Sequence, residues 1–107
     1  MKLNLSIKNI DQTFKSLQER LLTLSDNESQ KIVNNFVNEL KEVTPVDTGL
    51  ARDSWLQTKT KDGIDVSNTT EYIEYLNAGS SKQAPAHFIE RTALKYGTPK
   101  GVIVETG

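Results

Sequence analysis

Cysteine is absent from this chain, and histidine occurs once. Without cysteine there is no disulfide, no thiol nucleophile and no thiolate metal site, and one histidine cannot build a multi-histidine metal cluster. No apolar run approaches the roughly 20 residues that a membrane-spanning helix needs. The first residues alternate in polarity instead of forming an apolar block, so no secretory signal peptide is expected. We therefore expect no metal or other cofactor and no membrane partner.

The chain also has no excess of basic over acidic residues. Lys and Arg together number 13 against 14 acidic residues, which gives a formal net charge of -1. A dedicated nucleic-acid binder usually carries a basic surplus, so no sequence-specific nucleic-acid partner is expected. Hydrophobic residues make up only 36% of the chain, which indicates that part of it orders with a partner. The length of 107 residues fits a single domain, residues 1–107, with one modest core.

The first half of the chain predicts one strand and two helices. Residues 2–8 alternate strictly and are typical of a half-buried strand. Helical spacing begins after Asn9, and the pair Ser25 and Glu28 forms a capping-box pattern that starts a second helix or kinks a single long one. Pro45 ends this second helix, because the residue before a proline avoids the α region. The apolar stripes are Phe14, Leu17, Leu21 and Leu24 in the first helix, and Ile32, Val33, Phe36, Val37, Leu40 and Val43 in the second.

The second half predicts a hairpin, two helices and a last strand. Residues 54–60 and 64–68 alternate around Lys61-Asp62-Gly63, and Asp-Gly between alternating segments favours a hairpin. The apolar side of a short helix at 70–77 is Tyr72, Ile73, Tyr75 and Leu76, and that of a final helix at 86–96 is Phe88, Ile89, Thr92, Ala93 and Tyr96. Gly97 fits the position just after a helix. Residues 102–104 read as a strand that pairs with the protein's own sheet or with a neighbour's.

These elements define the expected fold class. It is α+β, with a small mixed or antiparallel sheet that has a central hairpin. The sheet packs against two N-terminal helices, or one kinked helix, and against a C-terminal helix.

None of the reactive residues forms a catalytic pattern. Ser80, Ser81 and Glu90 lie near His87 in sequence, but local proximity is not a triad. The segment from Gly79 to Lys82 lacks the second Gly-Lys pair of a phosphate-binding loop. Two carboxylates, Asp62 and Asp65, are too few for a calcium loop. Trp55 lacks the basic surroundings of a base-stacking site, so we expect it to pack in the core or at an interface. We predict that the protein is not an enzyme.

Two ordered segments resemble a known family. The first is Thr44-Pro45-Val46-Asp47-Thr48-Gly49-Leu50-Ala51-Arg52-Asp53-Ser54-Trp55. The second runs from Tyr72-Ile73-Glu74-Tyr75-Leu76-Asn77-Ala78-Gly79-Ser80-Ser81-Lys82 through Ala84-Pro85-Ala86-His87-Phe88-Ile89 to Ala93-Leu94. Together they are similar to the head–tail joining, or tail-completion, minor tail proteins of the neck of long-tailed bacteriophages and prophages. The order and spacing match across residues 44–94.

The resemblance implies a structural virion protein rather than a catalyst. Such proteins form a ring, commonly a hexamer, at the head-proximal end of the tail, where they complete the tail and join it to the DNA-filled head. The implied partners are further copies of the chain and the neighbouring neck, connector and tail-tube proteins. The implied location is the virion, after synthesis in the cytoplasm of the bacterial host. Assembly residues carried over from the motif are Pro45, Asp47, Thr48, Gly49, Arg52, Trp55, Tyr75, Gly79, Ser80, Lys82, Pro85 and Phe88.

One residue departs from the family pattern, and other classes remain open. Asn77 stands where the pattern often has an acid, so an intersubunit ion pair made by that acid would be missing here. The alternatives are a small protein-interaction or regulatory domain of a bacterial host and a nucleic-acid-associated domain with Lys59, Lys61 and Lys82 as its basis. Stable one-to-one binding without rings favours the former, and a steep salt dependence of DNA binding favours the latter.

Overall fold

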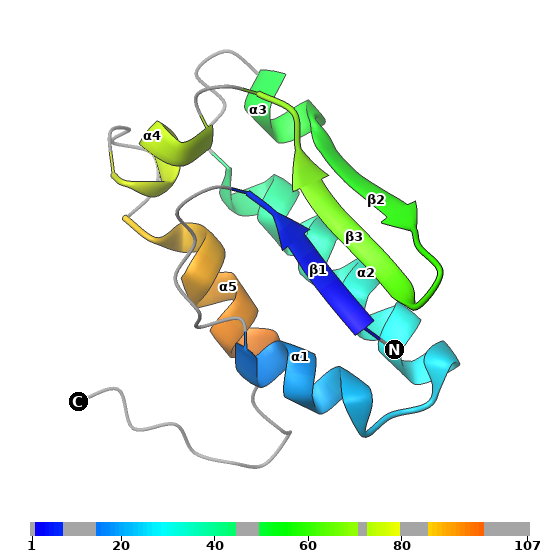
Figure 1. The fold of residues 1–107 in the computed structure, drawn as a ribbon. Coiled ribbons are helices and arrows are strands. Elements are labelled where there is room, and N and C mark those ends of the chain that lie inside the picture. Colours follow the sequence, from blue (N-terminus) through cyan, green and yellow to red (C-terminus); the bar gives the residue numbers. More distant parts are fainter. Residues whose placement is uncertain (1, 8–14, 45–49, 71–72, 80–85, 98–107) are drawn as a thin grey trace, which may run out of the picture.

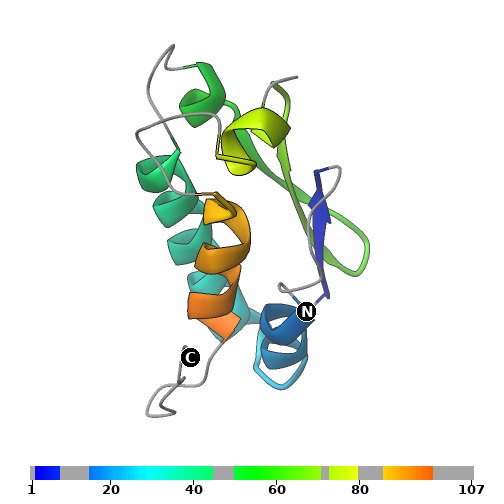
Figure 2. The ribbon, with the colours of Figure 1, turned by 90° about the vertical axis from the view of Figure 1, so that its left-hand side faces the viewer.

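The described part of the chain forms a three-stranded mixed sheet and five helices, which confirms the expected α+β class (Figure 1). The structure is a computed structural model that describes residues 2–7, 15–44, 50–70, 73–79 and 86–97. In chain order the elements are β1 (Lys2–Ser6), α1 (Lys15–Leu22), α2 (Asp26–Val43), α3 (Leu50–Asp53), β2 (Trp55–Lys59), β3 (Gly63–Asn68), α4 (Ile73–Asn77) and α5 (Phe88–Gly97). Viewed along the sheet, α2 and α5 lie together on one of its faces (Figure 2).

The strand order is β1-β3-β2, with β1 parallel and β2 antiparallel to β3. The predicted hairpin is confirmed, and its turn is closed by the Thr60 N–H, which donates to the Gly63 carbonyl at 2.9 Å. Gly63 is required where β1 begins, because a Cβ on it would lie 1.8 Å from the Lys2 carbonyl oxygen. The chain between β1 and β3 forms α1, α2, α3 and β2, so the parallel pairing joins two strands that are distant in sequence.

The core lies between the helices and the face of the sheet that carries the alternating apolar residues. Leu3 and Leu5 pair with Ile64 and Val66 on this face, in register. The opposite face is polar and exposed, and there Asn4 and Ser6 each donate to Asp65 Oδ1 at 2.6 Å. Period-two alternation therefore predicted the buried face of both strands. The helices contribute Leu17, Leu21, Val33, Phe36, Val37, Leu40, Phe88, Ile89 and Ala93 to the core.

The helices α1 and α2 are separate, because the helical backbone is interrupted at the predicted cap. Ser25 has extended backbone dihedral angles, and its Oγ accepts from the Glu28 N–H at 3.2 Å. Buried Ser29 ties the two helices together by donating from Oγ to the Leu21 carbonyl at 3.1 Å. The kinked single helix is thus excluded in favour of two helices. No helix in the described ranges is long and apolar enough to cross a membrane.

Two expectations about single residues were wrong. Tyr75 does not pack on the apolar side of α4, since its side chain is 69% exposed while Ile73 and Leu76 are buried. Gly97 does not follow α5 but is its last residue and is buried. A Cβ on Gly97 would lie 2.4 Å from Ser16 Oγ, so the glycine is needed for close helix packing rather than for a turn. Phe14, Tyr72 and the strand expected at 102–104 lie outside the described residues.

Candidate assembly site

The described parts of the two family-like segments lie at one end of the molecule. We call this the motif end and define it as Thr44, α3, α4 and the first turn of α5. The C-terminal end of α2 and the C-terminal end of β3 both lead to it, so α3 and α4 lie above the sheet and helices at the top of Figure 1. The described parts of both segments therefore lie at the same end of the molecule.

The first segment is held at both ends by buried hydrogen bonds. Trp55 is 3% exposed, and its Nε1–H donates to Thr44 Oγ1 at 2.8 Å. The Thr44 hydroxyl in turn donates to the Leu40 carbonyl in the last turn of α2. Between them, the Ala51 carbonyl accepts from Asn68 Nδ2 at 2.7 Å. These bonds fix α3 against α2 and β3 and position the described residues of the segment.

Arg52 adds a further anchor to the end of α2. Its Nε–H donates to the Lys41 carbonyl at 2.8 Å. A guanidinium at the C-terminal end of a helix also complements the partial negative charge of the last carbonyl groups. Arg52 was predicted as an assembly residue, and in the subunit it joins α3 to α2.

The second segment is organised around Asn77. Its backbone carbonyl accepts from the His87 N–H, and its Oδ1 accepts from the Ile89 N–H at 2.9 Å, which caps α5. Its Nδ2 donates to Glu90 Oε1 at 2.5 Å. Asn77 is 5% exposed, and its side chain bonds within the subunit. Asn77 therefore has an internal role, whereas the expected absence of an intersubunit ion pair at this position stays a prediction.

The carboxylate of Glu90 is buried and engaged on both oxygens. Oε1 accepts from Asn77, and Oε2 lies 3.0 Å from Nδ1 of His87, whose side chain is 66% exposed. His87 has φ of 62°, a left-handed conformation that is uncommon for a residue other than glycine. Both carboxylate oxygens of Glu90 are bonded within the chain. We therefore interpret Glu90 as a residue that stabilises the start of α5.

Large apolar side chains are exposed near the same end. Tyr75 is 69% exposed on α4, Leu50 is 57% exposed at the start of α3, and Leu56 is 49% exposed in β2 directly after α3. Leu22, the other highly exposed large apolar side chain among the described residues, is at the end of α1, at the opposite end of the molecule (Figure 1). Leu50 and Leu56 were not among the predicted site residues. The signal for Leu56 was its place on the strand face opposite Trp55, alternating with polar residues.

The predicted assembly residues fall into three groups. Trp55 and Phe88 are buried and support the site by packing. Arg52, Tyr75 and Gly79 lie at or near the surface of the motif end, and Gly79 has φ of 94° where it ends α4. The remaining predicted residues lie outside the described part of the chain: Pro45, Asp47, Thr48, Gly49, Ser80, Lys82 and Pro85.

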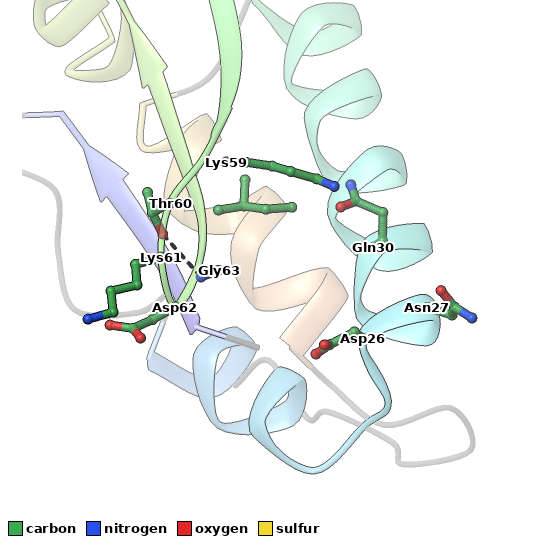
Figure 3. A pocket seen from close by; sticks show the side chains of 9 residues that line it. Asp26, Asn27, Gln30, Lys59, Thr60, Lys61, Asp62 and Gly63 are labelled. Carbon is green, nitrogen blue, oxygen red and sulfur yellow. Dashed lines mark hydrogen bonds between the residues drawn. The ribbon is translucent and has the colours of Figure 1, made fainter.

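One hollow lies away from the motif end, and a second borders its α5 turn. The larger, about 320 Å³, lies between the first turns of α2 and the β2–β3 hairpin, and its wall includes Asp26, Asn27, Gln30 and Lys59 (Figure 3). The other, about 240 Å³, lies between α2 and α5 beside Glu39, Val43 and Phe88. Within the described ranges no group of three or more His, Asp or Glu side chains is placed to hold a metal ion.

One polar cluster joins α2 to the end of α5. Glu39 Oε1 accepts from Lys95 Nζ at 2.7 Å and from the Tyr96 hydroxyl at 3.1 Å. The hydrogen bond and the negative charge of Glu39 raise the pKa of Lys95 above its usual value. Burial, together with the hydrogen bond to Glu39, raises the pKa of Tyr96. The Tyr96 ring also packs edge-on against Phe36, at 6.2 Å between ring centroids.

Comparison of this chain with protein-family models, curated proteins and solved structures found no match.

Proposed function

We propose that this protein is a structural component of a bacteriophage neck. It forms a ring, of six copies by the family resemblance, at the head-proximal end of the tail, and it completes the tail and joins it to the filled head. Its partners are further copies of itself and the neighbouring neck, connector and tail-tube proteins. No catalytic step is part of this role, and the protein's location is the virion.

One observation carries the proposal. The two segments that resemble the tail-completion family are separated in sequence by the β2–β3 hairpin, yet their described parts lie at the same end of the molecule, where hydrogen bonds within each segment and to β3 hold them. Three large apolar side chains, Leu50, Leu56 and Tyr75, are exposed around this end. Large apolar side chains that are exposed toward one end of a subunit suit protein–protein contact. A scaffold that holds such side chains in place is suited to assembly.

The test compares two surfaces in particles of the phage or prophage that encodes the chain. Without the protein, electron microscopy is expected to show filled heads and separate tails. Complementation with Tyr75→Ser combined with Leu50→Ser is expected to leave heads and tails unjoined, although the subunit keeps its unfolding temperature. The matched control, Leu22→Ser, removes an equally exposed apolar side chain at the opposite end and is expected to restore joined particles.

Two results would contradict the proposed neck function. Normal particles in the absence of the protein would refute the neck role. Stable one-to-one binding to a host protein, lost on Tyr75→Ser and without any ring, would favour the host interaction domain instead.

A further inference from the structure

The sheet has one open edge, formed by β2. In the antiparallel pair of β2 with β3, Thr60 and Gly63 face each other at a hydrogen-bonded position. Because such positions alternate along the ladder, the backbone N–H and C=O groups of Gln57 and Lys59 point away from β3. Among the residues that the structure describes, no further strand lies beyond β2, and four of its five residues are exposed.

The other edge, formed by β1, is partly closed. The Leu3 N–H points away from β3 and donates to Gln18 Oε1 of α1 at 2.6 Å. The helix α1 packs along β1, and Leu5 is buried. An added strand would displace the Gln18 bond here, whereas at β2 it would bond to groups that are unused within the described chain. The β2 edge is therefore the better acceptor.

We propose that the β2 edge binds residues 102–104 of a second copy of this chain as a parallel fourth strand. The segment Val102-Ile103-Val104 consists of strong strand formers, and addition of a strand to an exposed edge is a common mode of protein association. The proposal concerns self-association of the chain and does not depend on its role in a neck.

The side chains fix the direction and the register of this strand. Parallel alignment with Ile103 opposite Gln57 places Val102 beside Leu56, which is 49% exposed on the outer face of the sheet. The same alignment places Glu105 beside Lys59 on the inner face. An antiparallel strand centred on the same pair would bring Gly101 to Lys59 and would leave Glu105 at the other end of β2. Only the parallel strand matches both the apolar and the charged neighbours.

The surroundings of Lys59 also suit a carboxylate. The Lys59 side chain extends over the larger hollow toward Gln30 of α2, and Lys61 stands at the adjacent turn (Figure 3). The first turn of α2 faces the same hollow, and the N-terminal end of a helix favours negative charge. Asp26 and Asp62 are the acidic groups in this wall. Glu105 of the second copy would neutralise Lys59 at the mouth of the hollow.

The reach of the chain selects a second copy over the same one. Gly97 packs against Ser16 of α1, and α1 packs along β1, so the chain leaves α5 on the β1 side. From Gly97 to Val102 the chain makes five Cα–Cα steps, which span at most about 18 Å when fully extended. A strand beyond β2 is three strand spacings from β1, about 14 Å sideways, and the helix layer adds about 10 Å of depth. Gln18, beside the Gly97 contact, bonds to Leu3 at the level of Lys59, so Leu56 lies about 10 Å further along β2. The straight-line distance from Gly97 to a Val102 beside Leu56 is therefore about 20 Å, which exceeds the reach, so the donor is another subunit.

The absence of native cysteine allows a direct test by disulfide cross-linking of the full chain. Two single variants, Thr58→Cys and Val104→Cys, are mixed and oxidised, and covalent dimers are measured on non-reducing gels. The proposal expects a linked mixed dimer from this pair. Val102→Cys replaces Val104→Cys to test the antiparallel register, and Ser6→Cys replaces Thr58→Cys to test the β1 edge. Both control mixtures are expected to give at least about tenfold less dimer, because only neighbouring strands bring Cβ atoms into disulfide range.

A charge reversal gives an independent readout. Lys59→Glu and Glu105→Lys are each expected to reduce the dimer yield of the cysteine pair about threefold to tenfold, and the double reversal is expected to restore it. Equal or greater linkage through Val102→Cys would overturn the parallel register. Greater linkage through Ser6→Cys, an internally linked monomer of the Thr58→Cys/Val104→Cys double variant, or no linked dimer at all would overturn the proposal.

Discussion

The side-chain amide of Asn77 donates a hydrogen bond to Glu90 Oε1 at 2.5 Å, and both residues are buried. The amide also accepts from the Ile89 N–H, so one side chain satisfies a carboxylate and caps a helix at the same time. This dual role requires a group with a donor and an acceptor, which asparagine has and aspartate at neutral pH lacks. The acid that the family pattern often has at this position is thus incompatible with Glu90 as it stands.

Asn77→Asp is expected to lower the free energy of unfolding by about 3 kcal/mol at neutral pH, since it places a second negative charge beside a buried carboxylate. Chemical denaturation followed by circular dichroism measures the loss. Adding Glu90→Gln supplies a donor to the new carboxylate and is expected to recover most of the stability. If the double variant is no more stable than Asn77→Asp alone, the pairing of these two side chains is not the cause.

Gly97→Ala is expected to destabilise the fold by about 1–3 kcal/mol, although alanine is the better helix former, because overpacking forces neighbouring backbone to move. The added Cβ would lie 2.4 Å from Ser16 Oγ and 2.6 Å from the Leu17 nitrogen. Arg91→Ala, on the exposed side of the same helix, serves as the control and is expected to change little. A more stable Gly97→Ala protein would show that α1 and α5 separate without cost.

Trp55→Phe is expected to cost about 1–2 kcal/mol, because it keeps most of the buried ring but removes the donor to Thr44. Thr44→Val removes the acceptor instead and leaves the indole N–H buried without a partner. The two changes are expected to be less than additive in thermal or chemical unfolding, since they delete the same bond. Full additivity would assign the losses to packing alone.

The cluster of Glu39, Lys95 and Tyr96 is expected to weaken in alkali. Folding raises the pKa of Tyr96 above its ordinary value of 10.0 and that of Lys95 above 10.5. A group with a raised folded pKa stabilises the fold below its ordinary pKa, and this contribution is lost as the pH rises through the folded value. Stability should therefore fall above about pH 10. Glu39→Gln is expected to lower the pKa of Tyr96 in a phenolate absorbance titration, while burial keeps it raised in part; an unchanged titration would contradict the assignment.

Period and cap patterns predicted most of the fold, because they depend on nearby residues. The alternation around Leu3 and Val66 gave the buried face of the sheet, and the Ser25 cap separated α1 from α2. The parallel pairing of β1 with β3 could not be derived, since it joins residues about 60 positions apart through side chains that would suit other partners equally. The exposure of Tyr75 and the burial of Gly97 were not predicted for the same reason, because each depends on which helix packs beside the residue. At the candidate site, the residue types came from the resemblance, but the internal role of Asn77 depends on Glu90, which no local pattern connects to it.

The parallel β1–β3 pairing also sets the order in which the chain can fold. Asn4 and Asp65, which are bonded across these strands, are 61 residues apart, so β1 leaves the ribosome long before its partner exists. The β2–β3 hairpin and the contacts within α1 and α2 close over short loops. The pairing of β1 with β3 closes a long loop, and the loss of conformational entropy comes before the stabilising contacts form. Until then, Leu3 and Leu5 lack their sheet neighbours Ile64 and Val66, in a chain without cysteine to form a disulfide. Completion of the sheet is thus a late step, and its rate is governed by the distance along the chain rather than by the strength of either strand.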